Sequence, residues 1–403
     1  MWALREEMTS RERMALAMRH EEPDRVPVMC QLALGHYFVN TGVSNIEIWH
    51  DSAAFGEVLI ALQRRYGFDG ILINLPGRDP DWRGYIERIE RVGGEDHVVW
   101  QNGLVTICPP DDNPHVYQAD RTTRRFPSLD EVEAEKLYYV EPHDLTGLSY
   151  PTRWGFAPEP APRKDFFPPW HYETIRYVRA RAPEVSVHGE VWSPFSQLME
   201  LLDYTSALTA LLDDPGKVKA CLAALAEGTI ELMRGQARAG ADAVLISSAF
   251  AGAGFISREH YREFVLPCER AIIEGFKAEF PDVPVYTHTC GAIGDRLELM
   301  EETGTNGIDT LDPPPLGDVE LADAKRRVGS RLFIKGNMDP VNTLLLGMPA
   351  EVQCDARRRL EAGMSGGGYI LSTACSVSPR TPPENIAQLH MAAVEHGRYE
   401  VPA

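Results

Sequence analysis

The chain has 403 residues, 44% of them hydrophobic, and can therefore bury a large core as one big domain or two ordinary ones. Its formal net charge of -19 repels polyphosphate and anionic lipid, so we expect no nucleic acid and no membrane as partner, but a small molecule or another protein. The seven cysteines are scattered, and the N-terminal stretch lacks the uncharged core of a signal peptide, which favours free thiols in a cytoplasmic protein.

Short β-branched runs alternate with longer amphipathic stretches along most of the chain. Residues 9–20 read as a capped helix, and residues 257–280 as a helix with Ser257 as its N-cap. The predicted strands are 25–31, 69–75, 185–191, 241–247, 283–289, 307–312, 331–337 and 368–374. Eight strands separated by helices favour an α/β fold of the (β/α)8 TIM-like barrel type over an open doubly wound sheet. No glycine-rich dinucleotide fingerprint follows any strand, and we expect one barrel domain over residues 1–403.

Residues 76–184 interrupt this rhythm, which predicts an insertion between the second and third barrel strands. The stretch "GYIERIERVGGEDHVVWQNGLVTICPP" indicates antiparallel strands around the turn at Gly93 and Gly94. The remainder is rich in proline, charge and aromatic residues. Such an insertion serves equally well as a lid over the barrel mouth or as an ordinary packing subdomain.

A histidine and a cysteine lie two residues apart where the fifth predicted strand ends. His288 and Cys290 share one face of that strand because side chains alternate, and Cys375 follows the eighth strand. In a barrel the carboxyl ends of strands meet at one mouth, where active sites are found. One imidazole and two thiols suit zinc with a fourth position open, although most buried cysteines are simply small core residues. Four other cysteines fit that plainer interpretation; they are Cys30, Cys221, Cys268 and Cys354.

Other residues near the mouth are candidates for catalysis or for a substrate pocket. His188 and Glu190 end the third strand on one face and suit a catalytic acid or base, or else a satisfied histidine and a solvated carboxylate. An apolar substrate pocket would be lined by His36, Tyr37, Trp192, Phe195 and Tyr286, each of which ordinary packing also explains. Asn337 and Asp339 follow the seventh strand, where a substrate contact and a structural turn look alike.

Four motifs carry a resemblance to a known family. They are "RERMALAMRHEEPDRVPV", "GEVWSPFSQLMEL", "IKGNMDP" and "TPPENI". With them the chain resembles the uroporphyrinogen decarboxylase superfamily over nearly its whole length. Within that superfamily, "HTCG" followed by a late cysteine is similar to the zinc-dependent corrinoid methyltransferase branch.

The resemblance implies a set of roles. His288, Cys290 and Cys375 would hold Zn²⁺, with Asp312 as a candidate acidic ligand. The implied reaction moves a methyl group between a corrinoid protein and a small molecule, such as a methyl ether, methylamine, thiol or folate. The chain lacks an Asp-x-His-x-x-Gly motif, so methylcobalamin or a related corrinoid would arrive on a partner protein. An exposed barrel flank would suit a homodimer.

Two other functions remain open on the same fold. A metal-free decarboxylase would need cationic partners for its polycarboxylate substrate, yet Leu32 and His36 stand where the family's "PVWLMRQAGRY" stretch has arginines. A non-catalytic binding protein would keep the barrel, with at most a structural metal. Three ligands at an open mouth argue against that alternative, because structural zinc is usually enclosed by four protein ligands.

Overall fold

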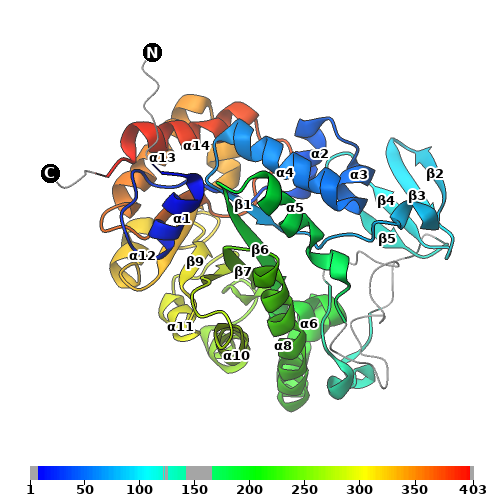
Figure 1. Ribbon diagram of the computed structural model, residues 1–403. Coiled ribbons are helices and arrows are strands. Elements are labelled where there is room, and N and C mark those ends of the chain that lie inside the picture. Colours follow the sequence, from blue (N-terminus) through cyan, green and yellow to red (C-terminus); the bar gives the residue numbers. More distant parts are fainter. Residues whose placement is uncertain (1–7, 121, 123–125, 142–165, 400–403) are drawn as a thin grey trace.

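The computed structural model describes residues 8–120, 122, 126–141 and 166–399. A curled parallel sheet of seven strands forms its centre, in the order β1-β6-β7-β8-β9-β10-β11, and helices cover the outside (Figure 1). Its strands are β1 Gly70–Ile73, β6 Ser186–Trp192, β7 Ala243–Ser247, β8 Val285–Thr289, β9 Gly307–Thr310, β10 Phe333–Met338 and β11 Tyr369–Thr373. All are buried except at Glu190 and Trp192 near the end of β6, as expected for strands covered on both faces. The predicted α/β fold of the TIM-like barrel type is confirmed.

Residues 27–32 lie between the two outer strands of the sheet. The Met29 N–H donates to the Leu371 carbonyl of β11 at 3.1 Å, and the Asp69 N–H before β1 donates to the Val28 carbonyl at 2.7 Å. The predicted first strand is thus present as an extended segment with isolated parallel bridges rather than a continuous ladder. Pro27 explains part of this difference, because proline has no N–H to give to a ladder.

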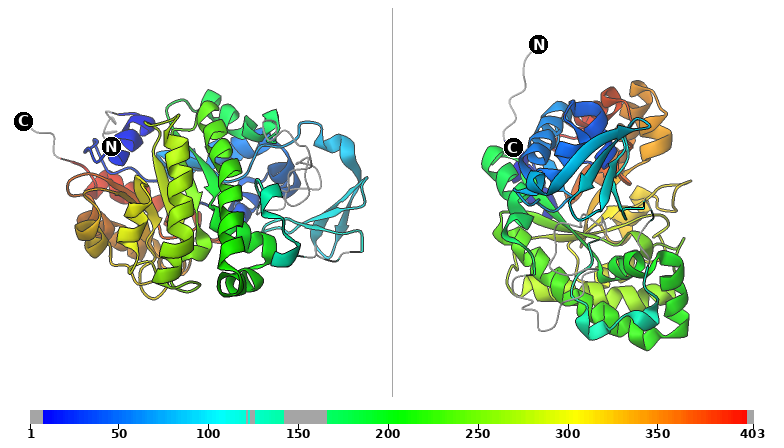
Figure 2. Two further views of the ribbon diagram at one scale, coloured as in Figure 1. Left: turned by 90° about the horizontal axis from the view of Figure 1, so that it is seen from below. Right: turned by 90° about the vertical axis from the view of Figure 1, so that its right-hand side faces the viewer.

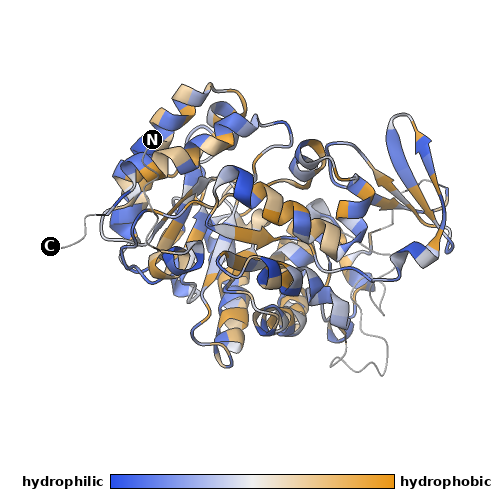
Figure 3. Cartoon of the chain, turned by 45° about the horizontal axis from the view of Figure 1, so that its top comes forward, coloured by the Kyte–Doolittle hydropathy of each residue, from blue (hydrophilic) through white to orange (hydrophobic). Residues whose placement is uncertain are grey.

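The helices bury one apolar side against the sheet and turn a polar side outwards (Figure 3). They are α1 Ser10–Met18, α2 Leu34–Thr41, α3 Asn45–His50, α4 Ser52–Tyr66, α5 Glu173–Arg181, α6 Pro194–Leu202, α7 Tyr204–Asp213, α8 Pro215–Arg238, α9 Arg258–His260, α10 Leu266–Lys277, α11 Leu297–Glu302, α12 Leu321–Arg327, α13 Pro349–Gly363 and α14 Pro383–His396. The predicted helix over 257–280 is capped by Ser257, as expected, but a π-helical turn over Tyr261–Val265 divides it. Within the described ranges, no helix is both long and apolar enough to cross a membrane.

The helix α1 closes the end of the barrel where the strands begin. Its Met14 and Met18 join Leu245, Tyr286 and Phe333 in one buried apolar cluster inside the barrel. The first turn of α1 is fixed by a capping box between Thr9 and Glu12. The three predicted metal ligands lie at the opposite end, where the strands finish.

The insertion contains a second, separate sheet. The strands β2 Ile86–Val92, β3 Glu95–Trp100, β4 Val105–Cys108 and β5 His115–Tyr117 pair antiparallel and lie at one end of the molecule (Figures 1 and 2). The predicted turn is confirmed, since Gly93 and Gly94 both have positive φ between β2 and β3. The end of the insertion differs from expectation, because α5 packs on α4 as part of the barrel's helical layer. Whether the insertion acts as a lid stays a prediction.

Candidate metal centre

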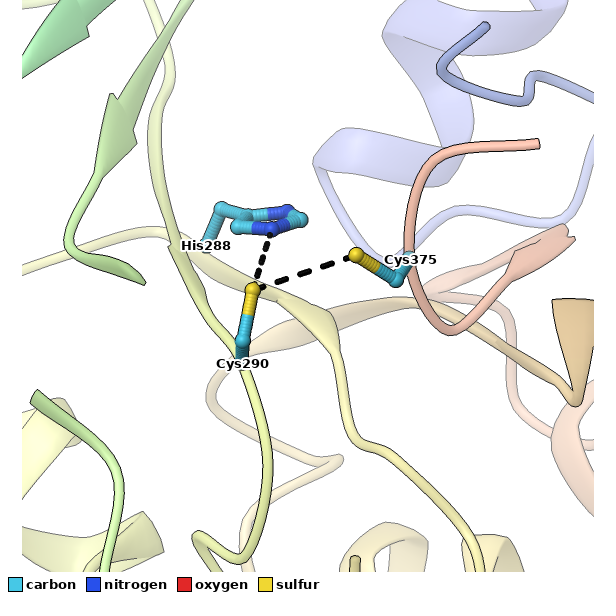
Figure 4. A group of neighbouring side chains, drawn as sticks. All are labelled: His288, Cys290 and Cys375. Carbon is cyan, nitrogen blue, oxygen red and sulfur yellow. Dashed lines mark hydrogen bonds between the residues drawn. The ribbon is translucent and has the colours of Figure 1, made fainter. Parts of the chain in front are cut away.

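Two strand ends bring three predicted ligands together. Tyr286 and His288 lie on the inner face of β8, and the strand ends one residue before Cys290. Gly291 then turns the chain with φ of 77°, a conformation that favours glycine. Cys375 comes two residues after the end of β11. The ligand atoms of His288, Cys290 and Cys375 all lie within 4.8 Å of one another. Figure 4 shows the ring and the two thiols directed toward one another from separate segments.

The distances within this group fit a tetrahedral metal ion. The His288 Nε2 lies 3.3 Å from the Cys290 Sγ, and the two sulfur atoms are 3.8 Å apart. Tetrahedral zinc, with bonds of about 2.3 Å to sulfur and about 2.0 Å to nitrogen, requires edges of roughly 3.8 Å between sulfurs and roughly 3.5 Å between nitrogen and sulfur. One borderline nitrogen and two soft sulfur donors also suit zinc chemically. The residues present therefore fit the metal that the sequence predicts.

A carboxylate behind His288 fixes its ring. The His288 Nδ1 is 3.2 Å from the Asp309 Oδ2, which leaves Nε2 directed at the thiols. Lys335 donates to the other oxygen of Asp309 at 3.0 Å, and all three side chains are buried. Strand register explains the arrangement, since His288 in β8 is paired with Asp309 in β9, and Asp309 with Lys335 in β10. Carboxylate–histidine pairs of this kind orient metal ligands in many proteins.

The charges of the three ligands differ in the metal-free protein. Burial opposes a charge on His288, but the hydrogen bond to Asp309 and the nearby Cys375 raise its pKa to about 10. The hydrogen bond from Cys290 lowers the pKa of Cys375, whereas that same bond together with burial raises the pKa of Cys290. These directions favour a proton on His288, a proton on Cys290 and a thiolate at Cys375. A metal ion would have to displace both of these protons.

Asp312 lies outside the three-residue group. Its Oδ2 accepts the Gly291 N–H at 2.6 Å, so this carboxylate holds the turn after Cys290. Burial raises the pKa of Asp312 to about 6, and the charge of Cys375 adds to the effect. The structure places Asp312 next to the ligands without directing it at them. Its proposed role as fourth ligand stays a prediction.

His188 and Glu190 occupy two levels of the barrel interior. His188 is wholly buried, 2.8 Å from the Tyr286 hydroxyl and 3.0 Å from the Ser186 hydroxyl, below the metal group. Burial lowers the pKa of His188 to about 4. Glu190 lies two residues further along β6, toward the mouth. Burial raises the pKa of Glu190 to about 7, although the charge of His288 acts to lower it. Only Glu190 is therefore positioned to act at the mouth.

The expected pocket residues are dispersed. Trp192, the last residue of β6, lines a hollow at the mouth together with Glu190. Tyr37 is buried against Phe55, within electrostatic reach of Glu190. His36 lies 2.8 Å from the Tyr66 hydroxyl and 3.1 Å from the Ser378 carbonyl, so both ring nitrogens have partners.

Three further pocket candidates take part in core packing or in structural hydrogen bonds. Phe195 on α6 is fully buried in the main core, and Tyr286 in the cluster near α1. Asn337 donates to the carbonyls of Leu311 and Val319 and accepts from Arg359. These side chains do not line the hollow, because packing and hydrogen bonds direct them elsewhere. The turn interpretation holds for Asp339, which caps the π-helical turn Pro340–Leu345.

The sequence interpretation missed functional candidates of two kinds. Asp309 and Lys335 face the barrel interior, and strand alternation combined with register would have found them. Glu141 and Tyr139 line the hollow from within the insertion. No sequence signal marks these two, because an irregular segment has no period that tells which side chains point inwards.

Comparisons with known proteins agree with this architecture. The family model described as "Uroporphyrinogen decarboxylase (URO-D)" matches residues 158–396. The uroporphyrinogen decarboxylases of Edwardsiella ictaluri and Pseudomonas paraeruginosa are each 30% identical to the chain, over 232 and 247 residues. The matches cover 55% and 59% of this chain and 63% and 66% of those proteins, less than two thirds of each.

Among solved structures, a methyltransferase from Methanosarcina mazei is similar, with a TM-score of 0.68 and 19% identity. The alignment covers 96% of this chain and 99% of that one, and at this identity it shows the shared fold. Because the family model spans more than half of the chain and the barrel agrees with it, the protein belongs to the uroporphyrinogen decarboxylase family.

Proposed function

We propose that this protein is a zinc-dependent methyltransferase that moves a methyl group between a corrinoid protein and a small molecule. The observation that carries the proposal is the group formed by His288, Cys290 and Cys375 at the open end of the barrel. Its His288–Cys290 and Cys290–Cys375 edges match those of tetrahedral zinc, and only three protein ligands converge among the described residues. An open fourth position is the mark of a catalytic rather than a structural zinc site.

The residues around this group have separate tasks. Asp309 would hold His288 in the tautomer that presents Nε2, and Lys335 keeps Asp309 charged, lowering the pKa of that carboxyl against the effect of burial. Bound zinc would supply the Lewis acidity that keeps a thiol deprotonated at neutral pH. Glu190, with a pKa near 7, would accept or release a proton at the same mouth.

The corrinoid is proposed to arrive on another protein. The sequence has no corrinoid-binding motif of the Asp-x-His-x-x-Gly type, and the zinc group lies at the accessible end of the barrel. Cys290 and Cys375 are only partly buried, which suits an approach by a large cofactor from outside. The M. mazei protein, a methyltransferase by name, shares this fold, which supports methyl transfer as the reaction.

A metal-free decarboxylase is the second candidate, favoured by the names of the curated relatives. That reaction needs cations for a substrate with many carboxylates. Here Leu32 is apolar, and burial lowers the pKa of His36 to about 4, which leaves it uncharged at neutral pH. The methyltransferase therefore accounts better for the residues at the mouth.

The decisive experiment is the metal content of protein purified without chelator. We expect close to one zinc per chain in the wild type, loss of most of it in Cys375→Ser, and no change in the control Cys354→Ser, whose cysteine is exposed. Wild type should also demethylate free methylcobalamin when a thiol acceptor is added, and Cys375→Ser should not. A metal-free wild type that decarboxylates a porphyrinogen would overturn the proposal.

A further inference from the structure

A hollow at the mouth, opposite the metal group, has its own chemistry. It lies where β1 and β6 finish, with Asn74 after β1 and with Glu190 and Trp192 at the end of β6. The insertion supplies its outer wall, including Tyr139 and Glu141. The metal group lies at the ends of β8 and β11, and the charge of His288 acts on Glu190. The hollow and the metal group thus belong to one mouth.

Three oxygens around this hollow have no hydrogen-bond partner among the described residues. They are the Asn74 Oδ1, the Thr174 Oγ1 and the Gln236 Oε1. Thr174 is 1% exposed and Gln236 is 6% exposed, so neither side chain lies on the outer surface of the protein. The Gln236 amide nitrogen is already used, since it donates to the Glu190 carbonyl at 2.7 Å. Buried polar atoms without partners are uncommon in native proteins, and three around one hollow indicate a ligand.

The charge of the lining is negative. Two carboxylates face the hollow, Glu190 and Glu141, and the latter accepts the Tyr139 hydroxyl at 2.9 Å. None of the described lining residues is a lysine or an arginine. Burial lowers the pKa of His171 to about 3, so this lining histidine is uncharged.

Arg78, whose charge acts on the lining residue His171, is not itself part of the lining. Arg78 donates to the carbonyls of Trp49 and Pro76, and its guanidinium lies 5.2 Å from the Trp49 ring centre. An anionic substrate would therefore meet two carboxylates and no free cation in this lining. That arrangement disfavours carboxylates, phosphates and sulfonates as ligands of the hollow.

We propose that this hollow binds the small-molecule substrate and that the substrate is a cation bearing an alkylated ammonium group. Carboxylates and carbonyl oxygens attract the positive charge, and the rings of Tyr139 and Trp192 offer the aromatic faces on which such cations rest. The substrate role rests on the proposed methyl transfer, whereas the binding chemistry follows from the hollow itself.

The test is isothermal titration calorimetry of the full chain with three probes of equal shape. They are choline, its neutral analogue with a tert-butyl group in place of the trimethylammonium group, and the corresponding tert-butyl carboxylate. We expect choline to bind at least about tenfold more tightly than the neutral analogue, and the carboxylate not to bind. Equal affinity for choline and the neutral analogue, or tighter binding of the carboxylate, would overturn the inference.

Variants separate the hollow from general surface charge. Glu141→Gln should weaken choline binding about fivefold to tenfold, because it removes one charge and keeps the shape. Glu87→Gln, an exposed change on β2, should leave the affinity unchanged. Trp192→Leu should also weaken binding, and circular dichroism of each variant verifies its fold. Unchanged affinity in folded Glu141→Gln and Trp192→Leu would place choline outside this hollow and refute the assignment.

Zinc measured in the same samples separates this inference from the proposed function. Protein that holds zinc and demethylates methylcobalamin but does not bind choline would refute the hollow assignment alone. Protein that binds choline through Glu141 but never holds zinc would support the hollow and refute the zinc enzyme.

Discussion

The ends of β8 and β11 present an imidazole and two thiols, whereas the ends of β1 and β6 present carboxylates, amides and aromatic rings. The first set is compact and almost fully partnered, with Asp309 and Lys335 behind it. The second has three oxygens without partners among the described residues and takes part of its wall from the insertion. The same mouth thus contains a preorganised group of metal ligands and a hollow whose oxygens are available to hydrogen-bond an organic ligand.

The largest expected effect is a loss of methyl transfer that leaves choline binding unchanged, so that the metal group and the hollow can be tested separately. Cys290→Ser should lower methyl transfer from methylcobalamin by more than about 100-fold, because a catalytic zinc site cannot lose a ligand and stay loaded. Its affinity for choline should stay within about twofold of the wild-type value, since Cys290 does not line the hollow. Glu141→Gln should show the converse, normal zinc content with weaker choline binding. Joint loss of both properties in either folded variant would show that the two sets are one site.

Lowering the pH should weaken zinc binding, with a steep dependence of the dissociation constant on pH. His288 and Cys290 both have raised pKa values in the metal-free protein, so each holds a proton at neutral pH, while Cys375 does not. Zinc must displace two protons, and its dissociation constant should rise by about 100-fold for each unit by which the pH falls. Chelator competition at two pH values measures this slope, and calorimetry in buffers of different ionisation enthalpy counts the protons. A flat profile would mean that the ligands are already deprotonated.

Substitution of Asp309 and of Asp312 tests which of the two carboxylates contributes to zinc binding. Asp309→Asn should weaken zinc binding by about 10-fold to 100-fold, since it removes the charge that orients His288. Asp312→Asn should change it by less than about threefold if that carboxylate only holds Gly291. Zinc competition assays on both variants give the comparison. A larger loss in Asp312→Asn would return that residue to the ligand set.

The smallest expected effect concerns stability. Thr174→Val removes a hydroxyl that has no partner among the described residues, so it should leave the free energy of unfolding unchanged or raise it by up to about 1 kcal/mol. The matched control is Thr229→Val, whose hydroxyl accepts from Gln197 and donates to the Leu225 carbonyl. That change should cost about 1–3 kcal/mol. Denaturant unfolding measures both, and an equal loss at the two sites would show that Thr174 is satisfied.

Strand positions could be predicted from sequence, and side chains on irregular segments could not. The barrel followed from the spacing of buried runs, and His288, Cys290 and Cys375 were found to converge because strand ends meet at one mouth. The sequence interpretation named Asp312 and did not consider Asp309, whereas the pairing of β8 with β9 decides which aspartate faces His288. Glu141 comes from a segment without regular structure, and its direction depends on long-range packing.

The segment 27–32 closes the barrel with only isolated bridges, and we call this part of the barrel its seam. It joins β11 and β1 through a few bridges, while every other neighbouring pair of strands shares a ladder of at least four paired positions. Backbone groups on a thin seam open locally at lower cost than those in a full ladder. We expect the amides of Met29 and Leu371 to exchange with deuterium before those of β8, as hydrogen-exchange mass spectrometry can measure. The chain runs from this seam directly into α2, which carries Tyr37 to within electrostatic reach of Glu190, and the seam also pairs Leu32 with Val377, two residues after Cys375. Local opening of the barrel at the seam would therefore affect both the Glu190 side and the Cys375 side of the mouth.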